Sequence, residues 1–371
     1  MDGSLRRGSW KIATVMGIPI RVHYSWLVVF GLITWSLSTY YFPAAAPDLP
    51  AKSYWLKGTV AALLLFCSVA FHELAHALVS RRYRMAIIDI TLFIFGGVAR
   101  MKGEPPTPGA EFRIALAGPL SSLFLSAFFL LLSLPPFSPG VKALYTYLAQ
   151  LNLVLGLFNL VPGFPMDGGR VVRSLLWKRK KNYFSATRTS SDLGQKIALC
   201  FILFGLLLIF MGSPGGLWLM LIGWFLYSAA QASYLQANLQ EALSGVTVRE
   251  VMVKDMVSID ASITLSEAVD RYFLRYAYGG FPVFDRGKYL GFITLREVKD
   301  MPREEWERIK VADVVVTHET TREVSPDLPV IRALELMITG DMGRLIVVDT
   351  GRVVGLITRN GIAQYVKVLG K

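Results

Sequence analysis

The sequence predicts a polytopic α-helical membrane domain followed by a soluble α/β region, for three reasons. Hydrophobic residues occupy 53% of the 371 positions and the mean hydropathy is +0.45, whereas soluble domains are roughly 45–50% apolar. Long apolar runs fill the first two thirds of the chain, and the segment after Ser244 has an ordinary soluble composition. That last segment contains an internal repeat. We therefore expect a membrane domain over residues 1–243 and a repeated soluble unit after it.

About six segments are apolar and long enough to cross a bilayer, which takes about 20 residues. They run Tyr24 to Tyr41, Trp55 to Ser80, Ala110 to Leu134, Val141 to Val161, Leu193 to Met211 and Gly216 to Tyr234. Lysine and arginine are concentrated before the first, after the second and after the fourth segment. Because basic loops remain on the cytoplasmic side, we expect a multi-pass protein of the cell membrane whose N-terminus and soluble C-terminal region are cytoplasmic.

The net charge of +12 does not indicate a nucleic-acid-binding protein. The basic residues lie between hydrophobic segments and not along one face of a soluble domain, so membrane topology explains them better. The run Lys178 to Lys181 is expected to anchor a helix end at anionic membrane lipid. The two cysteines, Cys67 and Cys200, both lie in apolar runs, which leaves neither a disulfide framework nor a CxxC metal site. Any bound metal must therefore have other ligands.

The loop between the second and third segments contains DITLFIFGGVARM, Asp89 to Met101, a pattern typical of strands. Its Gly96-Gly97 pair is a candidate tight turn. The pattern fits a β-hairpin that dips toward the membrane, and it fits a surface loop as well. Periodicity alone does not decide between them, so a membrane-associated hairpin and a surface loop both stay open.

Two histidines and a glutamate interrupt the second apolar segment, in the stretch FHELAHALVS. His72, Glu73 and His76 form HExxH, and on a helix this spacing places both imidazoles on one face, where they can ligate one zinc ion. Glu73 then lies beside the metal, as a general base should. A charged side chain at mid-bilayer costs at least about 2.5 kcal/mol, so a functional site is the default explanation. A catalytic zinc site usually has a third protein ligand, which another part of the chain must supply.

The best candidate for the third ligand is Asp167, in the stretch FNLVPGFPMDGGRVVRS. Pro162, Gly163 and Pro165 interrupt the fourth apolar run just before it, and proline removes an amide donor and frees upstream carbonyls. Non-helical backbone at membrane depth is tolerated only where it is buried in protein or lines a wet cavity. Asp167 should therefore face such a cavity. It could also cap the helix that starts at Gly168, and the two roles are compatible.

Together these motifs resemble the site-2 protease family of intramembrane zinc metalloproteases. The resemblance covers about Arg7 to Tyr234 and includes IFGGVAR, Ile94 to Arg100, and the AGPLSS stretch of the third span, Ala117 to Ser122. It implies one zinc ion per chain. The ligands that it implies are His72, His76 and Asp167.

The resemblance also implies the roles of the residues around the metal. Glu73 would take a proton from water and deliver it to the leaving amine. Asn159, which matches the family's asparagine upstream of Asp-Gly, would bind the substrate backbone or the oxyanion. A substrate helix must unwind before its carbonyl can be attacked, and the strand near Phe95, Gly96 and Gly97 could hold the unwound segment by strand addition.

The soluble region contains a repeat with a spacing of about 64 residues. GKYLGFITLREV, Gly287 to Val298, corresponds to GRVVGLITRNGI, Gly351 to Ile362, and the segments before them correspond as well. Each unit is expected to form a short strand, an amphipathic helix, two strands and a closing helix. This order resembles a tandem pair of cystathionine-β-synthase (CBS) domains, over residues 244–304 and 305–371. The predicted fold class is thus a polytopic α-helical membrane protein followed by a soluble α/β tandem CBS domain.

The CBS resemblance implies a regulatory module, since such pairs often bind adenine nucleotides. The family typically has Thr or Ser three residues before Asp. Here Thr294 precedes Glu297, and Thr358 precedes Gly361, which has no side chain. Two hypotheses remain: an adenine nucleotide bound at Thr294 and Thr358, or a module for docking or for forming a homodimer.

The leading functional hypothesis is an intramembrane zinc metalloendopeptidase that hydrolyses a peptide bond in or near a transmembrane segment of a membrane protein. This reaction is regulated intramembrane proteolysis, and its substrate would be a transmembrane protein such as a membrane-anchored transcriptional regulator or anti-sigma factor. The alternative is a CBS-regulated membrane transporter or channel. HExxH with a downstream Asp-Gly has no reason to occur in a pore, and the spans contain no visible inverted repeat.

Overall fold

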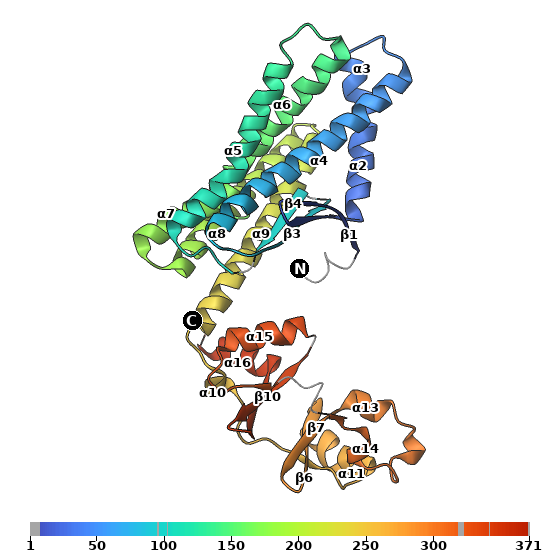
Figure 1. Cartoon of the computed structure of the whole chain (residues 1–371), viewed down its shortest axis with the longest axis vertical. Coiled ribbons are helices and arrows are strands. Elements are labelled where there is room, and N and C mark those ends of the chain that lie inside the picture. Colours follow the sequence, from blue (N-terminus) through green and yellow to red (C-terminus); the bar gives the residue numbers. More distant parts are fainter. Residues whose placement is uncertain (1–7, 95, 102, 318–322, 341, 370–371) are drawn as a thin grey trace. The chain divides into compact units, whose positions relative to one another are not determined.

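The chain folds as two units, residues 1–237 and 238–371. The computed structural model describes residues 8–94, 96–101, 103–317, 323–340 and 342–369. The first unit contains long apolar helices and a four-stranded sheet, and the second contains the α/β repeat (Figure 1).

Five helices of the described part are long and apolar enough to cross a membrane. They are Ser25–Ala45, which comprises α2 (Ser25–Ser36), η1 (Leu37–Tyr41) and α3 (Phe42–Ala45), then α4 (Ala51–Arg82), α5 (Pro108–Leu132), α6 (Pro139–Asn159) and α8 (Tyr183–Phe210). Figure 1 shows α4, α5 and α6 side by side, and they pack against one another. Large apolar side chains such as Phe124 and Phe204 are exposed on these helices, as contact with lipid requires.

The sixth predicted segment, Gly216 to Tyr234, lies in α9 (Gly215–Leu243), which is not among these five helices. α9 has 29 residues and is long enough to span a bilayer. Its second half is more polar, with Gln231, Gln236 and Gln240. The helix also continues past the division between the two units.

Four strands form a sheet in the first unit, in the order β1-β2-β3-β4. Their bounds are β1 (Ser9–Val15), β2 (Ile18–His23), β3 (Ile87–Phe93) and β4 (Gly96–Met101). β3 and β4 form an antiparallel hairpin, which confirms the hairpin alternative, whereas β1 and β2 were not predicted. The predicted turn at Gly96-Gly97 is wrong, because both glycines pair within β4, opposite Phe93 and Leu92. Gly96 is needed at the start of the strand instead, where its φ is +127°.

β4 lies alongside α4, the helix that carries HExxH (Figure 1). Ser80 of α4 donates a hydrogen bond to the sulfur of Met101, 3.2 Å away. Within the hairpin, Arg100 pairs with Asp89, which is only 4% exposed. Because β4 is the last strand of the sheet order, one of its edges carries backbone groups that do not pair with another described strand.

A shorter helix, α7 (Asp167–Lys180), follows an open segment that begins where α6 ends. Residues 160–166 are not helical, which confirms the predicted break. This segment packs closely on its neighbours through glycines. A Cβ at Gly169 would lie 2.3 Å from the carbonyl carbon of Gly163, and one at Gly194 of α8 would lie 2.1 Å from the oxygen of Phe164. No side chain fits at either position, so the backbone at Gly163 and Phe164 is buried in protein, as membrane depth requires, whereas Pro162 and Pro165 are exposed.

The second unit contains two copies of the predicted strand–helix–strand–strand–helix order. The first copy and its connections comprise α10 (Val248–Val251), β5 (Ile259–Asp260), α11 (Leu265–Ala268), η2 (Val269–Phe273), α12 (Leu274–Tyr276), β6 (Gly280–Asp285), β7 (Lys288–Thr294), α13 (Leu295–Lys299), η3 (Arg303–Glu305), α14 (Val311–Val314) and β8 (Val316–Thr317). The second copy comprises β9 (Glu323–Val324), α15 (Val330–Thr339), β10 (Arg344–Asp349), β11 (Arg352–Thr358) and α16 (Arg359–Leu369). Gly280 pairs with Thr294 in one hairpin and Arg344 with Thr358 in the other, which confirms the spacing of about 64 residues.

Two apolar cores form, one in each copy, and the core of the second copy also includes Val248 of α10. Two neighbouring residues of α15 test this second core. Met337 is fully buried against Leu345 and Val347, whereas Ile338 is 64% exposed. We expect Met337→Ala to lower the free energy of unfolding by about 2–5 kcal/mol, through lost transfer energy and the cavity left behind. The matched control Ile338→Ala should change it by less than about 0.5 kcal/mol. Denaturant unfolding of the two variants checks this, and equal effects would contradict the assignment of this core.

Candidate metal and catalytic site

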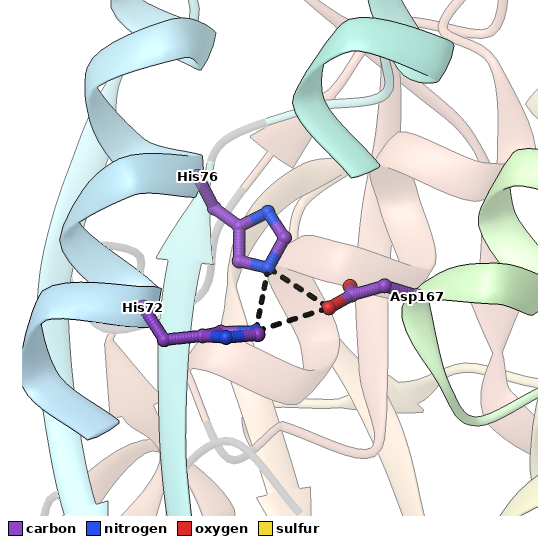
Figure 2. A group of neighbouring side chains, drawn as sticks. All are labelled: His72, His76 and Asp167. Carbon is purple, nitrogen blue, oxygen red and sulfur yellow. Dashed lines mark hydrogen bonds and ion pairs between the residues drawn. The ribbon is translucent and has the colours of Figure 1, made fainter. Parts of the chain in front are cut away.

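The histidines of HExxH lie one turn apart on α4 and point the same way. Figure 2 shows both rings directed at one carboxylate. His72 and His76 are 4% and 3% exposed, and their Nε2 atoms are 3.2 Å apart. The predicted placement of both imidazoles on one helix face is therefore correct.

The carboxylate comes from Asp167, the first residue of α7. Its Oδ2 lies 3.1 Å from Nε2 of His72 and 3.0 Å from Nε2 of His76. The N-cap position belongs to Met166, so the alternative in which Asp167 caps the helix is wrong. A negative charge in the first turn is nonetheless favourable, because it faces the positive end of the helix dipole.

The three donor atoms have the separations of one face of a tetrahedral metal site. Donors about 2.0–2.1 Å from a zinc ion at tetrahedral angles lie about 3.3 Å from one another, close to the 3.0–3.2 Å observed here. Two imidazole nitrogens and one carboxylate oxygen also form a donor set typical of catalytic zinc. Among the residues that the structure describes, this is the group of three whose ligand atoms converge in this way. The site therefore fits one zinc ion.

Helix α5 holds the outer nitrogens of both rings. Nδ1 of His76 lies 2.6 Å from the carbonyl oxygen of Ile114, and Nδ1 of His72 lies 2.8 Å from Oγ of Ser122. A carbonyl can only accept, so Nδ1 of His76 donates to Ile114, which leaves Nε2 as the nitrogen that can bind a metal. Such contacts fix the tautomer and the orientation of metal-binding imidazoles.

Between these two contacts, α5 presents Gly118 to the histidines. A Cβ there would lie 2.2 Å from Nε2 of His76 and 2.4 Å from Nε2 of His72. The absence of a side chain therefore opens the space in which the donor atoms meet.

Glu73 lies between the histidines and the sheet. Its Oε2 accepts a hydrogen bond of 3.1 Å from the backbone N–H of Ala99 in β4. A Cβ at Gly97 would lie 2.6 Å from Cγ of Glu73, so the glycine allows the strand to approach the helix this closely. The glutamate is thereby held at the edge of β4.

A cavity of about 240 Å³ lies between α4, β4, the end of α6 and the start of α7. The residues that line it are Val69, His72, Glu73, His76, Gly96, Gly97, Ala99, Met101, Leu155, Asn159, Pro165, Asp167 and Arg170. Thus the predicted residues Asn159, Gly96 and Gly97 all reach the same space as the donor triad. Nδ2 of Asn159 donates to the carbonyl of Leu155 in the previous helical turn, at 3.0 Å. Phe95, also predicted, lies outside the described residues.

Several contacts of the site were not predicted from the sequence. Ile114 acts through its backbone carbonyl, and Gly118 acts because it has no side chain. Neither role can be recognised from the type of side chain in the sequence. Ser122 lies in the AGPLSS stretch that was noted, but its partner could not be identified without the fold. Arg170 has a guanidinium nitrogen 3.9 Å from Oδ1 of Asp167, and it follows the Asp-Gly-Gly motif directly.

The threonines predicted to bind nucleotide lie in the second unit and cap helices. Thr294 donates its backbone N–H to the Glu297 carboxylate at 2.8 Å, and its hydroxyl contacts the same oxygen. Oγ1 of Thr358 accepts from the N–H of Gly361 at 2.9 Å. The Thr294 hydroxyl, which would have to contact a nucleotide, is therefore already hydrogen-bonded to Glu297.

Comparison with known proteins identifies the membrane unit. The model of peptidase family M50 matches residues 60–138 and 135–205. The chain is 36% identical over 369 residues, 98% of its length and 94% of the relative, to Rip3 of Mycobacterium tuberculosis, which is named as a candidate zinc metalloprotease. The chain belongs to this family of zinc metalloproteases. Zinc metalloprotease MJ0392 of Methanocaldococcus jannaschii is 31% identical, with 97% of each chain covered.

The family model of the CBS domain matches the soluble region twice, at residues 248–303 and 312–368. Among solved structures, a site-2 protease from Methanocaldococcus jannaschii is 34% identical and covers 61% of this chain and 95% of its own, with a TM-score of 0.43. The family models and the relatives show that the chain is an enzyme of the M50 family with tandem CBS domains, and its five long apolar helices make it a multi-pass membrane protein. The alternative of a transporter or channel is not supported.

Gly118 provides a test of the metal site. We expect Gly118→Ala to abolish stoichiometric zinc binding, because the new methyl group would lie where the two Nε2 atoms converge. Gly109, on the same helix, has open space around its Cβ position, so Gly109→Ala is the matched control and should bind zinc normally. Zinc content and affinity of both purified proteins check this. Normal zinc affinity in Gly118→Ala would show that the metal binds elsewhere.

Proposed function

We propose that this metalloprotease is an intramembrane endopeptidase that hydrolyses a peptide bond in or near a transmembrane segment of a membrane protein. The observation that carries the proposal is the convergence of His72, His76 and Asp167, in which both histidines and the neighbouring Glu73 lie on α4, a helix apolar enough to span a membrane. Buried ionisable groups in such helices mark functional sites. A membrane-anchored transcriptional regulator or an anti-sigma factor is a substrate of the proposed class.

The donor triad would hold zinc, which when bound lowers the pKa of water and polarises a carbonyl. Glu73 would remove a proton from the attacking water and transfer it to the nitrogen of the leaving amine, so that one carboxylate serves both steps. Ile114 and Ser122 would keep the imidazoles oriented throughout. Asn159, in the wall of the cavity, would bind the substrate backbone or donate to the oxyanion.

The free edge of β4 would bind the unwound substrate. The strand lines the cavity with Gly96, Gly97 and Ala99, and an extended peptide can add to an exposed edge through backbone hydrogen bonds. The N–H of Ala99 is held by Glu73 in the absence of substrate. A substrate strand that takes this N–H would release the carboxylate for proton transfer, which would couple substrate binding to the availability of the base.

We further infer that the N-terminus and the CBS domains are cytoplasmic. The supporting observation is that α4 ends in Arg81 and Arg82, and α7 ends in Lys178, Arg179 and Lys180. Basic helix ends remain on the cytoplasmic side. This orientation would open the site toward the cytoplasm and would direct a released fragment there.

The CBS pair would regulate the protease. Because Thr294 and Thr358 already cap helices, an adenine nucleotide would have to compete with Glu297 and with a backbone N–H. Dimer formation or docking of a partner is the alternative role.

Glu73→Gln tests the proposed reaction. We expect the variant to lose cleavage of a reconstituted transmembrane substrate by at least about 100-fold, because the amide cannot accept the proton, while zinc stays bound. Asp192→Asn is the matched control, since Asp192 is an exposed carboxylate paired with Lys196 on α8, and this variant should cleave normally. Full activity of Glu73→Gln would rule out the assigned base. Cleavage that is indifferent to zinc removal would rule out the proposed function.

Calorimetry of the full-length protein tests the nucleotide hypothesis. If the CBS pair senses adenine nucleotides, ATP or AMP should bind with measurable heat, and Thr294→Val should weaken that binding. No heat at millimolar nucleotide would exclude the sensor and favour dimer formation or docking.

A further inference from the structure

We propose that Arg173 is a positioning residue for the metal site, because it clamps α7 and the loop before it to α5 and thereby holds Asp167 within reach of the two histidines. The inference rests on the metal-binding part of the proposed function, but not on the substrate. Arg173 lies on α7, six residues after Asp167, which corresponds to about 9 Å along a helix.

The first arm of the clamp is a buried ion pair. Nε of Arg173 donates to Oε1 of Glu111 at 2.7 Å, and Nη2 donates to the same oxygen. Glu111, in the first turn of α5, is 0% exposed and Arg173 is 9% exposed. Taking both charges out of water is costly, so a pair this deeply buried needs an explanation beyond surface electrostatics.

The second arm is aromatic and reaches the loop that carries the ligand. The guanidinium lies 4.8 Å from the ring centroid of Phe164 and 4.7 Å from that of Tyr183. Phe164 is three residues before Asp167, and Tyr183 starts α8. Nη1 also approaches Oγ1 of Thr187, at 3.4 Å. One planar cation thus joins α5, the open segment and α8, and lysine could not reproduce this stacking.

Glu111 belongs to the same face of α5 that organises the histidines. Ile114, Gly118 and Ser122 follow it at spacings of three, seven and eleven residues, which share one side of a helix. That face holds both imidazoles directly, and through Glu111 and Arg173 it also holds α7. The positions of all three donor atoms are therefore fixed by contacts with one helix, α5.

A second buried ion pair in the same unit serves as a control that distinguishes a role in positioning the metal ligand from a role in stabilising the fold. Arg100 donates to Asp89 at 2.7 Å within the β3–β4 hairpin, and Asp89 is 4% exposed. Both residues belong to the β3–β4 hairpin and not to α7. If Arg173 only stabilised the fold, loss of either pair would have the same consequences for zinc.

The test compares Arg173→Met, Arg173→Lys and Asp89→Asn in the full-length protein in detergent. Zinc affinity is measured by competition with a chelator, and Tm is measured with and without zinc. We expect Arg173→Met to lower zinc affinity at least about tenfold, as loss of a group that orients a ligand does, and to reduce the zinc-dependent rise in Tm. Arg173→Lys should fall between Arg173→Met and the wild type. Asp89→Asn should lower Tm without zinc and leave zinc affinity unchanged.

Wild-type zinc affinity in Arg173→Met would overturn the proposal, as would an equal loss in Asp89→Asn. If Arg173→Met does not fold, Phe164→Leu carries the test, since it removes one stacking face beside Asp167 and keeps the ion pair. Unchanged zinc affinity in Phe164→Leu together with Arg173→Lys would then overturn it. Because the readout is zinc affinity, the result does not depend on whether the protein cleaves a transmembrane substrate.

Discussion

The constraint on which this structure depends is the cost of placing ionisable side chains inside an apolar helix. A charge at mid-bilayer costs at least about 2.5–3.5 kcal/mol, and an unpaired polar group there is also unfavourable. In α4 these costs are offset by partners for every group: both histidines face Asp167, their outer nitrogens meet α5, and Glu73 accepts from β4. The site therefore depends on the contacts with α5 and β4 as well as on the three ligands.

The same constraint explains the broken backbone before Asp167. A carboxylate on a continuous membrane helix could not approach α4 end-on, so the chain opens between α6 and α7 and a helix N-terminus presents the ligand. The open segment is covered by α8, where the N–H of Phe164 donates to the carbonyl of Ser190 and Oγ of Ser190 donates to that of Gly169. Close glycine contacts let α8 pack directly on the backbone of Gly163 and Phe164, and the irregular backbone is thereby tolerated.

The parts of the site that could be predicted from the sequence are those in which particular side chains recur at a characteristic spacing or in a characteristic composition. HExxH and the Pro-rich break before Asp167 have periodic or compositional signals, and the 64-residue repeat made the second unit predictable. The role of α5 was not predictable, because Ile114 acts through its backbone and Gly118 through the lack of a side chain. The hairpin turn was misplaced because Gly96 serves a strand start with positive φ. Strands β1 and β2 were missed because the sheet that holds them is set by a tertiary contact, the pairing of β2 with β3, which joins segments far apart in the sequence.

X-ray absorption at the zinc edge of the purified full-length protein tests the central claim most directly. We predict one zinc ion per chain, in a shell of nitrogen and oxygen at about 2.0–2.1 Å, with the outer scattering of two imidazoles, and loss of this ordered shell in Asp167→Ala. A sulfur scatterer at about 2.3 Å would point to a cysteine ligand. That result, or a zinc shell unchanged in Asp167→Ala, would contradict a metal site built from α4 and the start of α7.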